Sequence, residues 1–209
     1  MPNDLHRPET PAEAWKAIME GNERFATGTQ AHPRQDVDRI SAIAESQRPF
    51  ATLFGCADSR LSAEIIFDVG LGDLFVVRNA GQVIAETILG SLEFSVEVLK
   101  VPLILVLGHD NCGAIRATID SAEGHSPAQG EFIASLVKKI IPTVDAAHAE
   151  GITEIDDITE LHVIATVDEI LSRSKLIADA VAEGRLAIVG ANYRLAVGEV
   201  HPFVIHGQV

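Results

Sequence analysis

PLILVLGHDNCGA, residues 102–114, joins a run of apolar residues to a histidine, a cysteine and a glycine. An apolar run of this length and composition is typical of a strand that is buried on both faces of a parallel sheet. A helical pattern follows over residues 113–122, so His109 and Cys112 fall in the turn between a strand and a helix. In open α/β sheets, ligands bind beyond the carboxyl ends of the strands. We therefore expect both side chains at the ligand-binding edge of a sheet.

Three further apolar runs, at residues 50–56, 74–78 and 186–191, resemble this strand. Helical patterns separate the runs, around residues 62–67, 83–99, 113–122, 130–149 and 157–183. Strands that alternate with helices predict an α/β fold with a mostly parallel central sheet flanked by helices. A last run at 197–205 alternates imperfectly and predicts an edge strand.

The first part of the chain has a different pattern. Residues 11–26 predict an amphipathic helix opened by Thr10 and Pro11. Residues 27–35 are rich in glycine, proline and polar residues and predict a linker. We expect residues 1–209 to form one domain, with residues 1–35 as an N-terminal helical arm and linker that lies against another surface.

The composition excludes several classes of function. With 16 Lys and Arg against 30 Asp and Glu, the chain carries a formal charge of −14, which disfavours binding to nucleic acid. The N-terminal residues contain no apolar signal core, and no uncharged run approaches the roughly 18 residues that a membrane span needs. Only two cysteines are present. Such sparse thiols fit a reducing compartment, so we expect a cytoplasmic location.

Both cysteines stand at the exits of predicted strands, because Cys56 ends the run at 50–56. If the strand at 74–78 lies outside that run, the strand that ends at Cys56 and the strand at 102–107, which His109 and Cys112 follow, are neighbours. Two thiolates, an imidazole and a carboxylate from Asp58 suit tetrahedral zinc, and the start of a helix favours the thiolate of Cys112. The alternatives are a disulfide and two inert core thiols.

Asp58 and Arg60 form a D-x-R motif. One interpretation is a surface ion pair, which contributes little to stability. The other is an exchangeable zinc ligand, in which Arg60 draws Asp58 away from the metal and opens a coordination position. Because catalytic zinc sites keep an open position and structural sites are closed, Arg60 discriminates between a catalytic and a structural site.

CADSR (56–60), RNAG (78–81) and GHDNCGA (108–114) resemble the signatures of the β-class carbonic anhydrases of bacterial type. The resemblance runs from the N-terminal arm to about residue 197. It implies a dimer or a dimer of dimers with an exchanged arm, one Zn²⁺ per subunit, and reversible hydration of CO₂ to bicarbonate and a proton. It also implies Cys56, His109 and Cys112 as permanent zinc ligands, with Asp58 and Arg60 as a catalytic dyad.

Further residues carry expected roles. The Gly113 N–H is placed to stabilise a developing bicarbonate oxygen, or Gly113 is a small residue at a crowded turn. By resemblance, Phe75 and Phe94 line an apolar CO₂ pocket near the dimer interface, and core packing is the alternative. We expect Arg78 to support the end of its strand. The seven histidines other than His109, including His162, are expected on the surface or in linkers.

Two other functions stay open at this point. One is hydrolysis of a CO₂ analogue, carbonyl sulfide or carbon disulfide, in a pocket of different shape. The other is a noncatalytic binding protein with structural zinc. A thiol redox protein is disfavoured, because the chain has no C-x-x-C motif.

Overall fold

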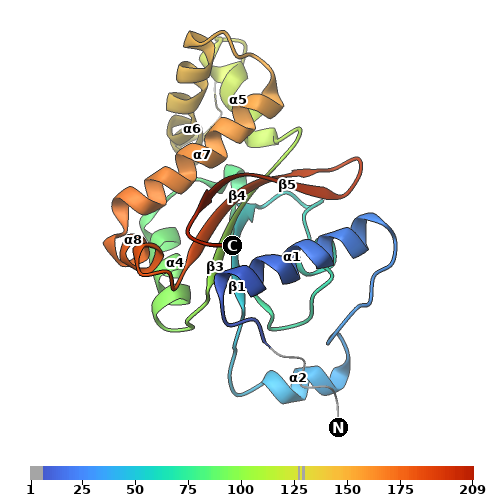
Figure 1. Ribbon diagram of the computed structural model, residues 1–209. Coiled ribbons are helices and arrows are strands. Elements are labelled where there is room, and N and C mark those ends of the chain that lie inside the picture. Colours follow the sequence, from blue (N-terminus) through green and yellow to red (C-terminus); the bar gives the residue numbers. More distant parts are fainter. Residues whose placement is uncertain (1–6, 127, 129) are drawn as a thin grey trace.

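The computed structural model describes residues 7–126, 128 and 130–209, so the first six residues of the predicted arm lie outside the described residues. The strands form one sheet in the order β2-β1-β3-β4-β5 (Figure 1). They are β1 (Ala51–Cys56), β2 (Leu74–Asn79), β3 (Leu103–His109), β4 (Ala187–Arg194) and β5 (Glu199–His206). The first four are parallel, and β5 is an antiparallel edge strand. The predicted fold class and edge strand are confirmed.

Helices cover both faces of this sheet. They are α1 (Pro11–Ala26), α2 (Val37–Ile43), α3 (Ala63–Ile66), α4 (Glu86–Glu97), α5 (Gly113–Ala122), α6 (Glu131–Ala149), α7 (Ile155–Arg173) and α8 (Lys175–Ala182), with a 3₁₀ turn η1 (Ala80–Gln82). Alternate residues of β3 point to opposite faces, as the strand period requires. Leu103, Leu105 and Leu107 join the core beneath α1, α3 and α5, whereas Ile104 and Val106 join the core beneath α4 and α8.

The predicted helix over 157–183 is wrong in one respect, because it breaks at Ser174. Ser174 adopts an extended conformation, with φ −107° and ψ 99°, and ends α7. Its hydroxyl donates to Glu93 Oε1 at 2.6 Å and accepts from the N–H of Ile177, so the same residue caps the start of α8. A serine that bonds its own backbone in this way favours a helix boundary over a helix interior.

One more helix boundary differs from the prediction, and one helix was not predicted. The helix expected over 83–99 begins at Glu86, because the Asn79 side chain bonds both the N–H and the C=O of Val83 and holds that segment extended. The unpredicted helix is α2. Val37, Ile40 and Ile43 recur at helical spacing and Asp36 caps the start, but the helix has only seven residues and none of them is buried, so its apolar pattern is short.

The N-terminal helix α1 packs against its own chain. The buried Asn22 side chain donates to Ile66 O and Gly198 O and accepts from the N–H of Val200. Gly21 permits the close approach, because a Cβ at that position would lie 1.8 Å from Phe67 O. Thr10 opens this helix, as predicted, and it forms a capping box with Glu13. The exchange of this arm between subunits stays a prediction.

Across the part of the chain that the structure describes, no helix combines the length and the apolar character that crossing a membrane requires.

Candidate metal centre

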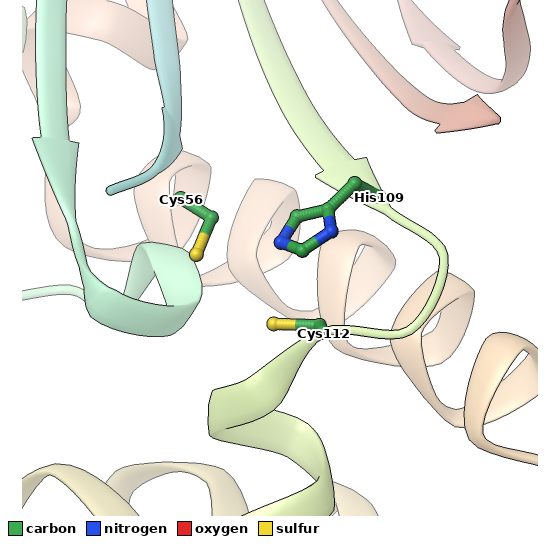
Figure 2. Close-up of side chains that lie close together, drawn as sticks. All are labelled: Cys56, His109 and Cys112. Carbon is green, nitrogen blue, oxygen red and sulfur yellow. The ribbon is translucent and has the colours of Figure 1, made fainter. Parts of the chain in front are cut away.

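Two neighbouring strands and one helix bring Cys56, His109 and Cys112 together. Cys56 ends β1, His109 ends β3 and Cys112 is the N-cap of α5. Strands β1 and β3 are adjacent because β2 lies on the outer side of β1, which is the strand order that the sequence argument required. The potential ligand atoms all lie within 4.8 Å of one another, and all three side chains are buried. Figure 2 shows the two sulfur atoms and the imidazole ring turned toward a common space.

The His109 ring offers a lone pair to that space. Its Nδ1 lies 2.8 Å from Asp110 O, and because a carbonyl oxygen only accepts, Nδ1 carries the proton. The unprotonated Nε2 is buried and has no hydrogen-bond partner among the described residues. A buried acceptor without a hydrogen-bond partner is unfavourable in a protein core. A free lone pair is, however, what a side chain needs in order to bind a metal.

The two thiols are free and form a coupled pair. A hydrogen bond from Cys112 lowers the pKa of Cys56, and the same contact raises the pKa of Cys112. The pair therefore releases its first proton readily and holds the second, and a divalent cation would displace the second proton. The backbone N–H of Gly81 also donates to Cys56 Sγ at 3.4 Å. The cluster is already arranged to carry negative charge on sulfur.

The turn between His109 and Cys112 is fixed by bonds to other parts of the chain. Asp110 donates its N–H to Tyr193 O at 3.2 Å and accepts from the N–H of Leu195 at 3.0 Å. Asn111 has a positive φ of 51°, and its N–H donates to Asp156 Oδ1 at 3.0 Å. These bonds hold the two ligands on one side of the turn.

The fourth predicted ligand, Asp58, faces Arg60 in this structure. Arg60 Nε lies 2.9 Å from Asp58 Oδ1 and its terminal nitrogen lies 2.7 Å from Oδ2. These bonds from Arg60 hold the pKa of Asp58 well below its usual range. Asp58 Oδ2 is nevertheless 3.8 Å from His109 Nε2. The carboxylate thus borders the cluster, while its oxygens bond the guanidinium.

Arg78 supports the segment that carries two of these groups. Its Nε donates to Cys56 O at 2.9 Å, and its terminal nitrogen donates to Asp58 O at 2.5 Å. A single side chain therefore ties the end of β1 to the turn that follows it, which is the supporting position expected for Arg78.

The remaining predicted residues differ in their relation to the cluster. Gly113 is the first residue of α5 and is exposed, and a Cβ built there meets no atom within 4 Å, so crowding within the chain does not explain this glycine. Phe75 and Phe94 contact each other, with ring centroids 6.1 Å apart. Phe75 pairs with Thr52, four residues before Cys56, which is about 13 Å along the strand. A pocket role for these rings stays a prediction that needs a second subunit.

One expectation about the histidines is wrong. His162 lies on α7 and is only 5% exposed, and its Nε2 is 2.9 Å from Gly81 O. It was expected on the surface or in a linker because it lacks ligand spacing with the proposed metal set. The signal for burial is its place on the helix, since Ile158, His162, Thr166 and Ile170 recur every four residues and all are buried.

Comparisons with known proteins agree with this geometry. The family model described as carbonic anhydrase matches residues 51–200. Carbonic anhydrase 2 of Mycobacterium tuberculosis is 48% identical over 188 residues, which are 90% of each chain. A carbonic anhydrase of Mycolicibacterium smegmatis is 46% identical over 201 residues, covering 96% of this chain and 94% of the relative.

Among solved structures, the Coccomyxa β-carbonic anhydrase in complex with acetazolamide superimposes with a TM-score of 0.72 at 29% identity. The match covers 91% of this chain and 87% of that one. Sequence relatives, fold and the arrangement of two cysteines and a histidine at the sheet edge agree, and this chain belongs to the β-carbonic anhydrase family of enzymes.

Proposed function

We propose that this protein catalyses the zinc-dependent, reversible hydration of CO₂ to bicarbonate and a proton, with one Zn²⁺ per subunit. The observation that carries the proposal is the buried set of two sulfurs and one unpartnered imidazole nitrogen within 4.8 Å, with a carboxylate held beside it. Three protein ligands with a fourth position open are typical of catalytic zinc, and sulfur and nitrogen donors suit this metal.

Cys56, His109 and Cys112 would hold the zinc. When bound, zinc supplies the Lewis acidity that makes a nucleophile from water near neutral pH. The two thiolates balance the charge of the cation. They also donate more electron density than imidazoles would, so we expect kcat/KM to rise from neutral to alkaline pH.

Asp58 and Arg60 would orient the attacking group. An ionised carboxylate only accepts hydrogen bonds, and Asp58 borders the cluster, so it can hold a proton donor with its lone pair turned toward CO₂. Arg60 fixes both carboxylate oxygens and keeps Asp58 ionised at working pH, because its bonds lower the pKa of Asp58. Asp58 would ligate the metal only when this pairing is broken.

The Gly113 N–H would stabilise the developing bicarbonate oxygen. It belongs to the first turn of α5, where backbone N–H groups lack partners within the helix. The open space around its Cα leaves room for a substrate oxygen. Such donors act where negative charge develops in a transition state.

A dimer or dimer of dimers in the cytoplasm completes the proposal. Apolar side chains of α4, of its C-cap and of the edge strand β2 are exposed in the single chain, namely Phe94 (43%), Val98 (60%) and Val76 (37%). A second subunit would cover them and bring the Phe75–Phe94 pair toward a metal centre. Two free thiols are compatible with a reducing compartment.

Stopped-flow CO₂ hydration tests the proposal, with the zinc content of each sample measured. We expect wild type to hold one zinc per chain and to turn over, and Asp58→Ala to keep its zinc while losing turnover by about 100-fold. A wild type that holds zinc but is inactive from pH 7 to pH 9 would favour the noncatalytic binding protein. Faster hydrolysis of carbon disulfide or carbonyl sulfide than hydration of CO₂ would favour the CO₂-analogue hydrolase.

A further inference from the structure

His162 and the metal ligand Cys56 are joined by two hydrogen bonds through one residue. His162 Nε2 lies 2.9 Å from Gly81 O, and Gly81 N lies 3.4 Å from Cys56 Sγ. The carbonyl only accepts, so His162 Nε2 is the donor, and the Gly81 N–H is the donor to sulfur. Burial lowers the pKa of His162, which is the condition for a neutral ring with its single proton on Nε2.

The turn that carries Gly81 is conformationally demanding. Gly81 has φ 73° and Gln82 has φ 39°, so two consecutive residues are left-handed and only one of them is glycine. A Cβ on Gly81 would lie 2.8 Å from Ala114 Cβ and 3.0 Å from Ile140 Cδ1. Such a conformation persists only where surrounding contacts impose it.

Only part of that constraint comes from the turn itself. Asn79 bonds Val83 and closes the flanks of the turn. Gln82 contributes nothing of this kind, because both polar atoms of its buried side chain lack partners among the described residues. The centre of the turn is held from outside, by a side chain of α7 that is 81 residues away in sequence.

We propose that His162 is a positioning residue of the metal centre, which holds Gly81 so that its backbone N–H stays on the Cys56 thiolate. A hydrogen bond to a thiolate withdraws electron density from the sulfur and orients it, and partners of this kind tune both metal affinity and Lewis acidity. The inference rests on the proposed metal site. It does not depend on which substrate the protein turns over.

The test uses Co²⁺ in place of zinc and compares three variants with wild type. His162→Phe keeps a ring of similar size but removes the donor. His162→Gln restores an N–H that reaches toward Gly81 O. The matched control is Thr159→Val, a change of similar size at another buried polar residue of α7, whose hydroxyl donates to Ile155 O and not to His162.

In His162→Phe we expect the thiolate-to-cobalt absorption to move to lower energy and the metal affinity, from competition with a chelator, to fall 10- to 100-fold. His162→Gln should recover most of both, and Thr159→Val should match wild type. A wild-type spectrum and affinity in His162→Phe overturn the inference. An equal loss in Thr159→Val overturns it as well, because the effect is then one of packing.

A measurement on wild type keeps the inference testable if a variant does not fold. With ¹¹³Cd bound, the Gly81 amide proton should show scalar coupling to the metal across the N–H···S bond, and its absence overturns the inference. Failure of the proposed function is distinguishable, because it appears in wild type as loaded metal without turnover. A wild type that binds no metal overturns both.

Discussion

Two aspartate–arginine pairs stand in contrasting parts of this molecule. Asp58 and Arg60 lie beside the metal cluster, are two residues apart in sequence, and leave the Arg60 side chain 51% exposed. Arg24 in the last turn of α1 pairs with Asp68, 44 residues away in sequence, and the Asp68 side chain is 0% exposed. Both pairs have a short contact, 2.7 Å in the first and 2.6 Å in the second.

The surroundings of the two carboxylates differ. Asp68 also accepts from the N–H groups of Ala31 and His32, each at 2.9 Å, so protein donors surround it. Asp58 borders an imidazole nitrogen that has no partner among the described residues. A buried, fully bonded carboxylate that joins distant segments serves folding, whereas an accessible pair beside an unsatisfied acceptor nitrogen serves chemistry. The same two residue types thus have different roles because of what surrounds them.

The largest expected effect comes from removing a sulfur at the metal cluster. Structural zinc sites bind with about 10–16 kcal/mol shared among four ligands, so Cys112→Ser should lower metal affinity by roughly 100-fold or more and abolish turnover. Metal analysis and chelator competition measure it. The docking of α1 through Asp68 lies outside this site, so Asp68→Asn should keep wild-type metal affinity. Equal metal loss in both variants would contradict the separation of the two regions.

The second-largest effect is expected for Asp68→Asn, which should lower the free energy of unfolding. Breaking a buried ion pair costs about 3 kcal/mol of unfolding free energy, measurable by urea denaturation. Burial alone would raise the pKa of Asp68, but hydrogen bonds from Ala31 and Arg24 outweigh it and leave the pKa lowered. A lowered folded-state pKa gives stability that is present above the unfolded pKa and is lost as the pH falls through the folded value.

The difference between wild type and Asp68→Asn should therefore shrink as the pH falls below about 4. Asp58→Asn is the matched control. The pKa of Asp58 is also lowered, but its partner Arg60 is 51% exposed and solvent screens the pair, so near neutral pH the urea midpoint should stay close to that of wild type. A pH-independent difference would show that Asp68 acts through packing instead of charge.

Arg60→Ala should have the smallest effect, and it sharpens the contrast most directly. It should lower kcat/KM by about 10-fold, because Asp58 loses its orientation, while the midpoint of thermal unfolding stays within about 3 °C. Arg24→Ala is its counterpart and should do the reverse, with a lower midpoint and unchanged kcat/KM. If Arg60→Ala lowers the midpoint of thermal unfolding more than Arg24→Ala does, then the sequence separation and the exposure of the two pairs do not predict their roles.

Much of the fold was accessible from local patterns. All five strands overlap the runs that apolar composition predicted, although most of them extend past the predicted end by one to three residues, and α1 and α5 match their predicted bounds. Patterns failed where a side chain overrides periodicity, as Ser174 does between α7 and α8. They also failed for α2, which is seven residues long and has no fully buried residue. The apolar pattern carries most of the sequence signal, and it marks neither the break at Ser174 nor so short a helix.

The sequence by itself determined the donor chemistry, because His109 and Cys112 share one strand-to-helix turn and such turns are set by neighbouring residues. Tertiary structure alone decided that Cys56 meets them, since this needs β1 beside β3, and strand order follows from packing the whole core. It alone decided that His162 faces inward to Gly81, across 81 residues. The physical reason is range. Backbone turns depend on contacts over a few residues, whereas the environment of a buried polar group is assembled from segments that only the folded core brings together.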